Sequence, residues 1–215
     1  MNILKMLCRG GSTPPSISYR TSASDTTAGS YTFSAQDIGT AGSNRHVIVG
    51  ILGTSADGDP VTIGACTIGG VAATVAISQA GNANGHTANL IIAAVPTGAT
   101  ANIVVVANGP WANCAIGVWA AYDLTSITAV ATAGSTADPT TLNLNTQSGD
   151  IVVAVMRATN GTATTWTGVT ERFDTTVETM LYTGGEHTAT STETPRTVSG
   201  DSDGTGQTGV SASWR

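Results

Sequence analysis

The stretch VTIGACTIGGVAATV, residues 61–75, decides the fold class of this chain. Two runs rich in β-branched residues flank the pair Gly69 and Gly70. Branched side chains fit the pleated surface of a strand better than a helix. A Gly-Gly pair supplies the positive φ angles that the tightest hairpin turns require. The stretch therefore predicts a β-hairpin that turns at these two glycines.

Outward from this hairpin, short apolar or alternating runs recur between Gly, Asn, Asp and Pro residues, which is typical of a chain of short strands. The candidate strands lie at residues 17–21, 30–34, 45–53, 61–68, 71–78, 88–95, 101–107, 114–122, 128–133, 140–144, 150–158, 169–173, 178–183, 196–198 and 209–214. Their connections are too short for the crossovers that parallel strands need, which take roughly a dozen residues. We therefore expect an all-β fold, an antiparallel β-sandwich with jelly-roll-like connections.

Four of these runs are almost continuously apolar, at residues 46–52, 90–95, 103–106 and 151–156. A strand that faces water on one side alternates apolar and polar residues, whereas a continuous apolar run is typical of a strand buried on both faces. The four runs therefore predict central strands, packed between sheets or under a partner subunit. Residues 184–206 are instead rich in Thr, Ser, Gly and acids, and they predict a long surface loop before the last strand.

Two consecutive prolines, Pro14 and Pro15, separate the N-terminal segment from the strand pattern. Because proline fixes φ and has no amide donor, residues 1–15 predict a short extended arm outside a single domain of residues 16–215. No composition shift marks a further boundary, and no clean internal repeat is visible. Lys5 interrupts the apolar run of the arm, so no signal peptide is expected. No apolar run approaches the roughly 18 residues of a membrane span, so we expect no membrane association.

Charge excludes one class of partner. Of the 215 residues only 10% are charged, and 8 basic residues stand against 14 acidic ones for a net charge of −6. No basic stripe can neutralise phosphates, so direct nucleic-acid binding is not expected.

The three cysteines, Cys8, Cys66 and Cys114, have the spacing of neither a zinc site nor a disulfide framework. We expect Cys66 and Cys114 to be inert core thiols. Cys8 lies in the arm, where a bridge between copies remains open.

One segment, Gly200-Asp201-Ser202-Asp203-Gly204, matches the G-x-S-x-G pattern of hydrolases. That pattern requires a sharp turn from a strand into a helix, and here no helix is expected and two carboxylates flank the serine. The same acids, and Asp57 with Asp59, offer oxygen ligands to calcium. Ala212, however, stands where a calcium loop would place its bidentate acid. Polar turns are the simpler interpretation.

Other candidate catalytic groups are few. Glu186 and His187 lack the second histidine of a helical zinc motif, and His46 and His86 are expected to be structural. Glu171 and Glu178, on neighbouring candidate strands, are the one acid pair that fits glycoside hydrolysis in principle. We therefore expect no catalytic residue, no cofactor and no metal, and a protein that is not an enzyme.

Two tryptophans are candidates for contact with a ligand, because an aromatic ring offers a flat apolar face to a sugar. Trp111 follows Gly109-Pro110, and Trp166 lies in a segment rich in Thr and Gly. Both are better candidates for exposure and for contact with a ligand than the other aromatic residues, although a structural role is the simpler interpretation of each. Trp119 lies inside an apolar run and is expected in the core.

Residues 44–51, 61–75 and 149–154, with the closing strand that ends at Trp214, resemble tailed-phage and prophage virion proteins of the jelly-roll or β-sandwich type. The resemblance implies a structural accessory role in the virion, such as capsid decoration or part of a collar, tail or fibre. It also implies other virion proteins, capsid or tail subunits, as partners.

Composition agrees with such a role, because neutral surfaces can be buried in a symmetric assembly at low desolvation cost. We expect a homo-oligomer whose assembly arm contacts neighbouring subunits. Its candidate contact residues are Ile3, Leu4, Met6, Leu7 and Cys8. An alternative is a module that binds a host-surface glycan through residues 79–87 and 184–206, and a glycan hydrolase is a third. The position on the particle, the number of subunits and any ligand stay open.

Overall fold

The computed structural model describes residues 13–27, 29–81 and 85–215, which form strands, turns and loops without a helix. The all-β prediction is confirmed; the expected contact residues of the arm lie outside the described residues. The first strands are β1 (Ser16–Asp25), β2 (Tyr31–Asp37), β3 (Arg45–Ser55), β4 (Thr62–Ile63), β5 (Thr67–Ile68), β6 (Val71–Ala72), β7 (Thr74–Ala80), β8 (His86–Ala94), β9 (Thr100–Val105), β10 (Ala107–Asn108) and β11 (Trp111–Tyr122). The remaining strands are β12 (Ala131–Ser135), β13 (Thr140–Thr146), β14 (Ile151–Thr159), β15 (Thr164–Thr167), β16 (Thr170–Val177), β17 (Met180–Thr188), β18 (Glu193–Ser202) and β19 (Thr205–Trp214).

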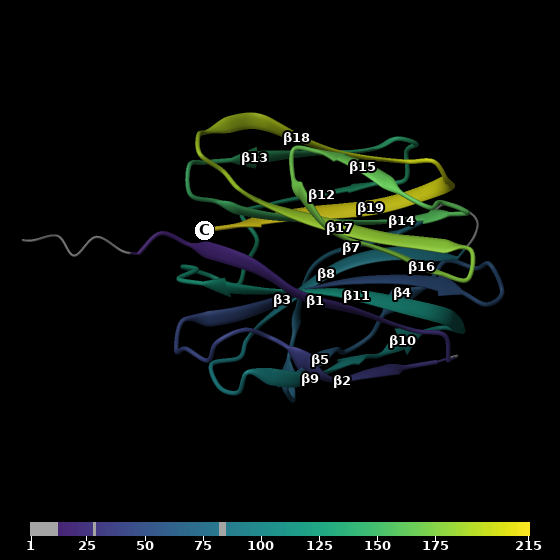
Figure 1. The fold of residues 1–215 in the computed structure, drawn as a ribbon, viewed down its shortest axis with the longest axis horizontal. Helices are drawn as coiled ribbons and strands as arrows, with labels where there is room; N and C mark the ends of the chain where they lie inside the picture. The colour runs from purple at the N-terminus through teal and green to yellow at the C-terminus, as the bar shows by residue number, and fades with distance from the viewer. Residues whose placement is uncertain (1–12, 28, 82–84) are drawn as a thin grey trace, which may run out of the picture.

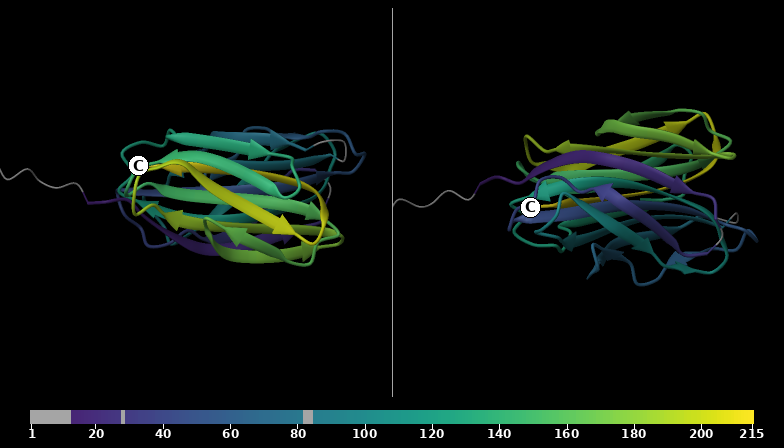
Figure 2. Two further views of the ribbon diagram at one scale, coloured as in Figure 1. Left: turned by 90° about the horizontal axis from the view of Figure 1, so that it is seen from above. Right: turned by 60° about the horizontal axis from the view of Figure 1, so that its bottom comes forward.

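Four of the five sheets that the described residues form are stacked on one another (Figure 1), and the fifth is the short pair of β4 and β10. Inner sheet I has the order β1-β11-β3-β8-β7, and inner sheet II has the order β12-β19-β14-β17-β16. Outer sheet I, β2-β9-β5-β6, covers inner sheet I, and outer sheet II, β13-β18-β15, covers inner sheet II. The right view of Figure 2 shows that the N-terminal and C-terminal parts of the chain occupy opposite halves of the stack. The molecule is therefore an antiparallel sandwich of four layers.

Three apolar layers fill the spaces between the four sheets, and the alternation along the central strands explains them. On β3, Val47 and Val49 face outer sheet I, while Ile48 faces inner sheet II. On β14, Val153 lies in the middle layer, while Val152 lies in the layer below outer sheet II. Successive side chains of a strand point to opposite faces. The prediction that β3, β8 and β14 are buried on both faces is confirmed.

Two expectations about burial and loops are wrong. Residues 103–106 belong to outer sheet I, where Ile103 and Val105 are buried but Val104 and Val106 are only half-buried. Residues 184–206 are not a surface loop, because β17 runs to Thr188 and β18 and the start of β19 follow. Their small residues permit close packing: a Cβ atom on Gly184 would lie 2.8 Å from the Phe173 ring. The short strand β15 was not expected.

The hairpin at residues 61–75 is present but short. Gly69 and Gly70 adopt φ angles of 60° and 78°, and Ile68 pairs with Val71 across the turn. Only β5 and β6 form this hairpin. β4 pairs with β10, and β7 continues into inner sheet I, so the chain crosses from one sheet to the other between β6 and β7.

Both halves of the chain have the same connectivity. If the main strands of each half are counted in order, both inner sheets read first, eighth, third, sixth, fifth, and both outer sheets contain the second, seventh and fourth. This strand order resembles that of a jelly roll, except that the fifth strand lies in the inner sheet and not beside the fourth strand. The expected unit of residues 16–215 thus consists of two topologically equivalent, jelly-roll-like halves.

The two halves pack through their inner sheets, and some of the strand contacts are equivalent in both halves. The central strands β3 and β14 face each other, β7 packs on β12, and β1 packs on β16. Because β1 corresponds to β12 and β7 to β16, exchanging the halves preserves these contacts. The symmetry is partial, because β7 also packs on β19, whereas the equivalent strands β16 and β11 make few contacts.

Candidate functional site

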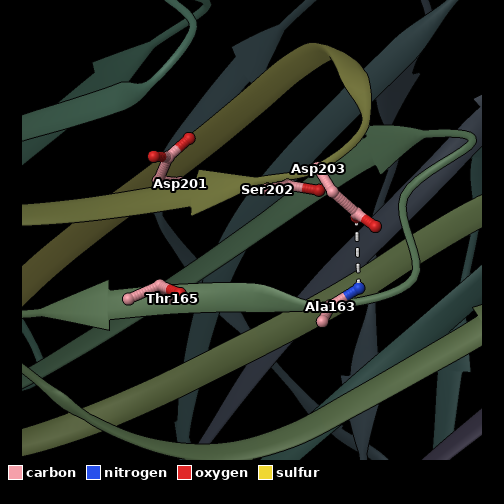
Figure 3. A pocket seen from close by; sticks show the side chains of 5 residues that line it. All are labelled: Ala163, Thr165, Asp201, Ser202 and Asp203. Carbon is pink, nitrogen blue, oxygen red and sulfur yellow. Dashed lines mark hydrogen bonds between the residues drawn. The ribbon is translucent and has the colours of Figure 1, made fainter.

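The G-x-S-x-G segment lines a pocket of about 400 Å³ at one end of the sandwich (Figure 3). The pocket lies between the end of β18 and the start of β15, and its lining residues are Ala163, Thr165, Asp201, Ser202 and Asp203. The segment that carries the hydrolase-like motif therefore lies at a pocket.

The geometry of this pocket does not activate a nucleophile. The segment joins strand β18 to strand β19, so the strand-to-helix turn of a hydrolase is missing. The Ser202 hydroxyl is nearly buried and accepts a hydrogen bond from the Gly204 amide at 3.0 Å. Ser202 is therefore part of the turn that closes this hairpin.

Asp203 is used to hold a neighbouring loop. Its carboxylate accepts hydrogen bonds from the Thr162 amide at 2.7 Å, the Thr162 hydroxyl at 2.6 Å and the Ala163 amide at 3.3 Å. The hydrogen bonds from Thr162 and Ala163 lower the pKa of Asp203. Asp203 thus fixes the loop between β14 and β15 to the β18–β19 hairpin.

The second acidic turn has a similar internal role. Asp57 accepts hydrogen bonds from the Ser55 hydroxyl and from the Asp59 amide, the latter at 3.1 Å. These bonds lower the pKa of Asp57. Within residues 13–27, 29–81 and 85–215, no three His, Cys, Asp or Glu side chains gather in the way a metal ion requires. The geometry of both turns agrees with the polar-turn interpretation.

The fold separates the two acids considered for glycoside hydrolysis. Glu171 lies near the start of β16 and Glu178 follows its end. At about 3.3 Å per residue, the two backbones are roughly 20 Å apart. Glycosidases need their carboxyl groups within about 10 Å. Glu178 instead accepts a hydrogen bond from the Asn113 amide group at 3.2 Å.

Glu186 and His187 are adjacent on β17 and therefore point to opposite faces. Glu186 is nearly buried and forms an ion pair with Arg172 at 2.8 Å. Burial raises the pKa of Glu186 despite this partner. The pair is therefore split between two environments and does not form one site.

The structure places the two candidate ligand-facing tryptophans differently. Trp111 is fully buried, so the expectation that it is exposed is wrong. Its indole covers Gly53, where a Cβ atom would collide with the ring, and its centroid lies 6.1 Å from that of Tyr31. Trp166 is half-buried at the rim of the layer below outer sheet II and donates a hydrogen bond to Thr183 at 2.8 Å. Only part of the Trp166 ring is accessible.

A buried polar cluster between the inner sheets was missed. Arg157 on β14 is fully buried, and its guanidinium donates to the Thr159 hydroxyl at 3.2 Å and contacts the Met180 sulfur. Burial lowers the pKa of Arg157 to about 10. Burial and the Arg157 charge lower the pKa of His86 to about 4. The one sequence signal for this cluster is a charged residue inside the apolar β14 run.

A second, smaller pocket of about 210 Å³ lies near the C-terminal residue. Its lining is mostly neutral and polar: Val130, Ala131, Asn145, Thr146, Gln147, Thr192, Thr194 and Arg215. The Thr146 hydroxyl is buried without a hydrogen-bond partner among the described residues. The Arg215 guanidinium forms two hydrogen bonds to Asp150, at 2.8 and 3.0 Å. The pocket offers amide and hydroxyl groups to a small polar molecule.

Charged residues are distributed unevenly. No Asp, Glu, Lys or Arg occurs in residues 60–122, which supply β4 to β11. The ion pairs seen in the described part of the chain join Arg20 to Asp37, Arg172 to Glu186, Arg196 to Glu193 and Arg215 to Asp150. Most of outer sheet I is therefore an uncharged surface.

The fold defines the class of this molecule: an all-β protein built as a four-layer antiparallel sandwich. Comparison with family models, curated proteins and solved structures finds no match. The described residues contain no helix of the length and hydropathy that membrane crossing requires. The functional argument therefore depends on the surfaces described above.

Proposed function

We propose that this protein is a non-enzymatic structural component of a phage virion, a capsid decoration or other accessory head or tail protein that attaches to neighbouring subunits. The observation that carries the proposal is the uncharged face of outer sheet I. Its exposed side chains include Thr32 on β2 and Thr100 and Asn102 on β9. Such a face can be buried against another protein without desolvating an ion.

The rigidity of the stack supports the same role. Three continuous apolar layers hold the four sheets together. A surface carried by a packed core loses little conformational freedom on binding, so less of the binding free energy is spent on ordering. A particle component that must present a fixed face to its neighbours benefits from this property.

The position of the N-terminal arm supports attachment to a neighbour. β1 is paired from its first residue, because Ser16 lies opposite Tyr122 of β11. The preceding residues Thr13 and Pro14 are exposed. The arm therefore starts from a fixed point at the edge of inner sheet I. We propose that Ile3, Leu4, Met6 and Leu7 contact a neighbouring virion subunit.

A cosedimentation assay tests the proposal. Purified protein is mixed with particles that lack it, and the bound fraction is measured after centrifugation. Thr32→Glu places a charge on the outer face of outer sheet I, and Thr141→Glu is the matched control on the equivalent strand of outer sheet II. We expect binding by the wild type and by Thr141→Glu, and reduced binding by Thr32→Glu. No binding by the wild type, or equal binding by both variants, would contradict the proposal.

One observation favours a second candidate, a module that binds a host-surface glycan. The smaller pocket presents Asn145 and Gln147 amides and Thr192 and Thr194 hydroxyls, groups that can bond to sugar hydroxyls. A glycan array tests this candidate. A hit that Asn145→Ala abolishes would support it, and an empty array would remove it.

A further inference from the structure

One side of the sandwich, where β7 and β12 lie, collects the exposed apolar side chains. Among the described residues, the large hydrophobic side chains that are exposed are Val71, Val75, Ile127 and Val130, at 40, 44, 37 and 50%. Val71 and Val75 belong to β6 and β7. Ile127 and Val130 precede β12, which packs on β7 and lies above it in Figure 1. Exposed apolar side chains that gather on one side of a protein are typical of an interaction site.

The same side exposes two free sheet edges. β7 is the last strand of inner sheet I and β12 is the last strand of inner sheet II, and no other described strand pairs with either on its outer side. The two edges are close together: a Cβ atom on Gly134 of β12 would lie 2.5 Å from the Gln79 side chain of β7. A free edge presents unpaired amide and carbonyl groups that can pair with another strand.

The opposite side, formed by β1 and β16, is protected against such pairing. β1 has a bulge at Arg20 and β16 has one at Arg172, and both arginines form ion pairs. Bulges and charges are the devices that block edge-to-edge association. β7 also has a bulge, between Val75 and Ile77, but it has no charged side chain, and neither does β12. Pairing with a strand of another molecule is therefore blocked at the β1 and β16 side of the sandwich and open at the β7 and β12 side.

The distribution of charged residues indicates which partner can bind to the β7 and β12 side. The chain carries a net charge of −6, yet residues 60–122 and 124–137 contain no Asp, Glu, Lys or Arg. These two ranges supply β6, β7, β12 and the segment before β12. Two copies of an acidic protein repel each other least when they meet through an uncharged side.

We propose that this side binds a second copy of the chain, with β7 antiparallel to β7 and β12 antiparallel to β12 around a two-fold axis. A two-fold axis makes the patch its own complement, because each valine contact occurs twice. Both inner sheets then continue from one subunit into the other. This inference makes the homo-oligomer expected from the sequence specific, and it rests on the proposed function only for its biological purpose.

The test is the mass of the full chain in solution, measured by light scattering after size exclusion over a range of concentrations. Val75→Lys and, separately, Val130→Lys place an unpaired charge in the contact. Thr176→Lys is the matched control on the exposed face of β16. We expect a dimer for the wild type and Thr176→Lys, and a dissociation constant raised by roughly a hundredfold or more for both valine variants.

A thermal melt of each variant separates a lost contact from a lost fold. Because one valine lies on β7 and the other just before β12, the test stays decisive if one variant unfolds. A monomeric wild type, or a dimer that survives both valine substitutions, would overturn the inference. The outcome is independent of particle binding: a dimer without particle association would leave this inference standing and remove the proposed function, and the reverse result would do the opposite.

Discussion

Gly50 on β3 lies directly against Val155 on β14, so closely that a Cβ atom on Gly50 would collide with the Cγ1 atom of Val155. These residues belong to the central strands of the two halves. Their contact lies in the apolar layer between the two inner sheets. The two halves can approach this closely because Gly50 has no side chain.

Gly50→Ala is expected to destabilise the protein by about 1–3 kcal/mol, the usual cost of overpacking a core. Urea unfolding of both proteins measures the difference. Val155→Ala in the same background should recover part of the loss, because it removes the colliding methyl group. A Gly50→Ala protein as stable as the wild type would show that the halves separate easily.

Stability is expected to fall in mild acid because of His86. Burial and the Arg157 charge lower the pKa of His86 to about 4 in the folded protein, against 6.5 ordinarily. Protonation then favours the unfolded chain, so the contribution is intact above pH 6.5 and is lost as the pH falls toward 4. The loss is about 3 kcal/mol at 1.36 kcal/mol per pKa unit.

Unfolding free energies of the wild type and His86→Gln at pH 7 and at pH 4.5 measure this effect. The wild type should lose more stability than the variant between these two values. Burial also lowers the pKa values of His46 and His187. The unfolding free energy of the variant should therefore still fall with decreasing pH, but less steeply. Equal slopes for the two proteins would show that His86 titrates normally.

Cys66 and Cys114 are expected to resist thiol reagents in the folded protein. Both are buried and free, as the sequence indicated, and burial raises the pKa of each thiol. The reactive thiolate is therefore scarce and inaccessible. A colorimetric thiol count should leave these two unmodified until denaturant is added. Rapid labelling of Cys114 in native buffer would contradict the packing of the layer between inner and outer sheet I.

Removal of residues 1–15 is expected to leave the sandwich folded and to weaken its attachment to particles. Ser16 begins β1 and is already paired with Tyr122, so the truncation removes no described strand. Circular dichroism and cosedimentation, measured on the same truncated protein, check the two halves of this prediction. Full attachment of a folded truncated protein would remove the arm from the account.

The sequence predicts the fold class well because strand periodicity and glycine turns are local. The repetition of the same strand order in the two halves could not be predicted in this way. The central strand of the first half reads RHVIVGILGTS and that of the second reads IVVAVMRAT, so the shared strand order is not visible as a repeat in the sequence. Only the pairing of distant strands reveals it.

The candidate site shows the same division between local and distant information. The segment around Ser202 was selected by its motif and does line a pocket. The carboxylate of Asp203 in this segment, however, accepts hydrogen bonds from backbone amides 40 and 41 residues away in the sequence. No local sequence pattern encodes such distant contacts. Trp111 was misplaced for a related reason, because Gly53, which makes room for its ring, lies on another strand.

Immunogold electron microscopy of particles purified from a producing host, with an antibody against residues 16–215, tests the central proposal most directly. The account predicts gold label on intact particles, over heads for a decoration protein or over tails for a tail component. Particles without label, from cells in which the protein is expressed, would contradict a structural role in the virion.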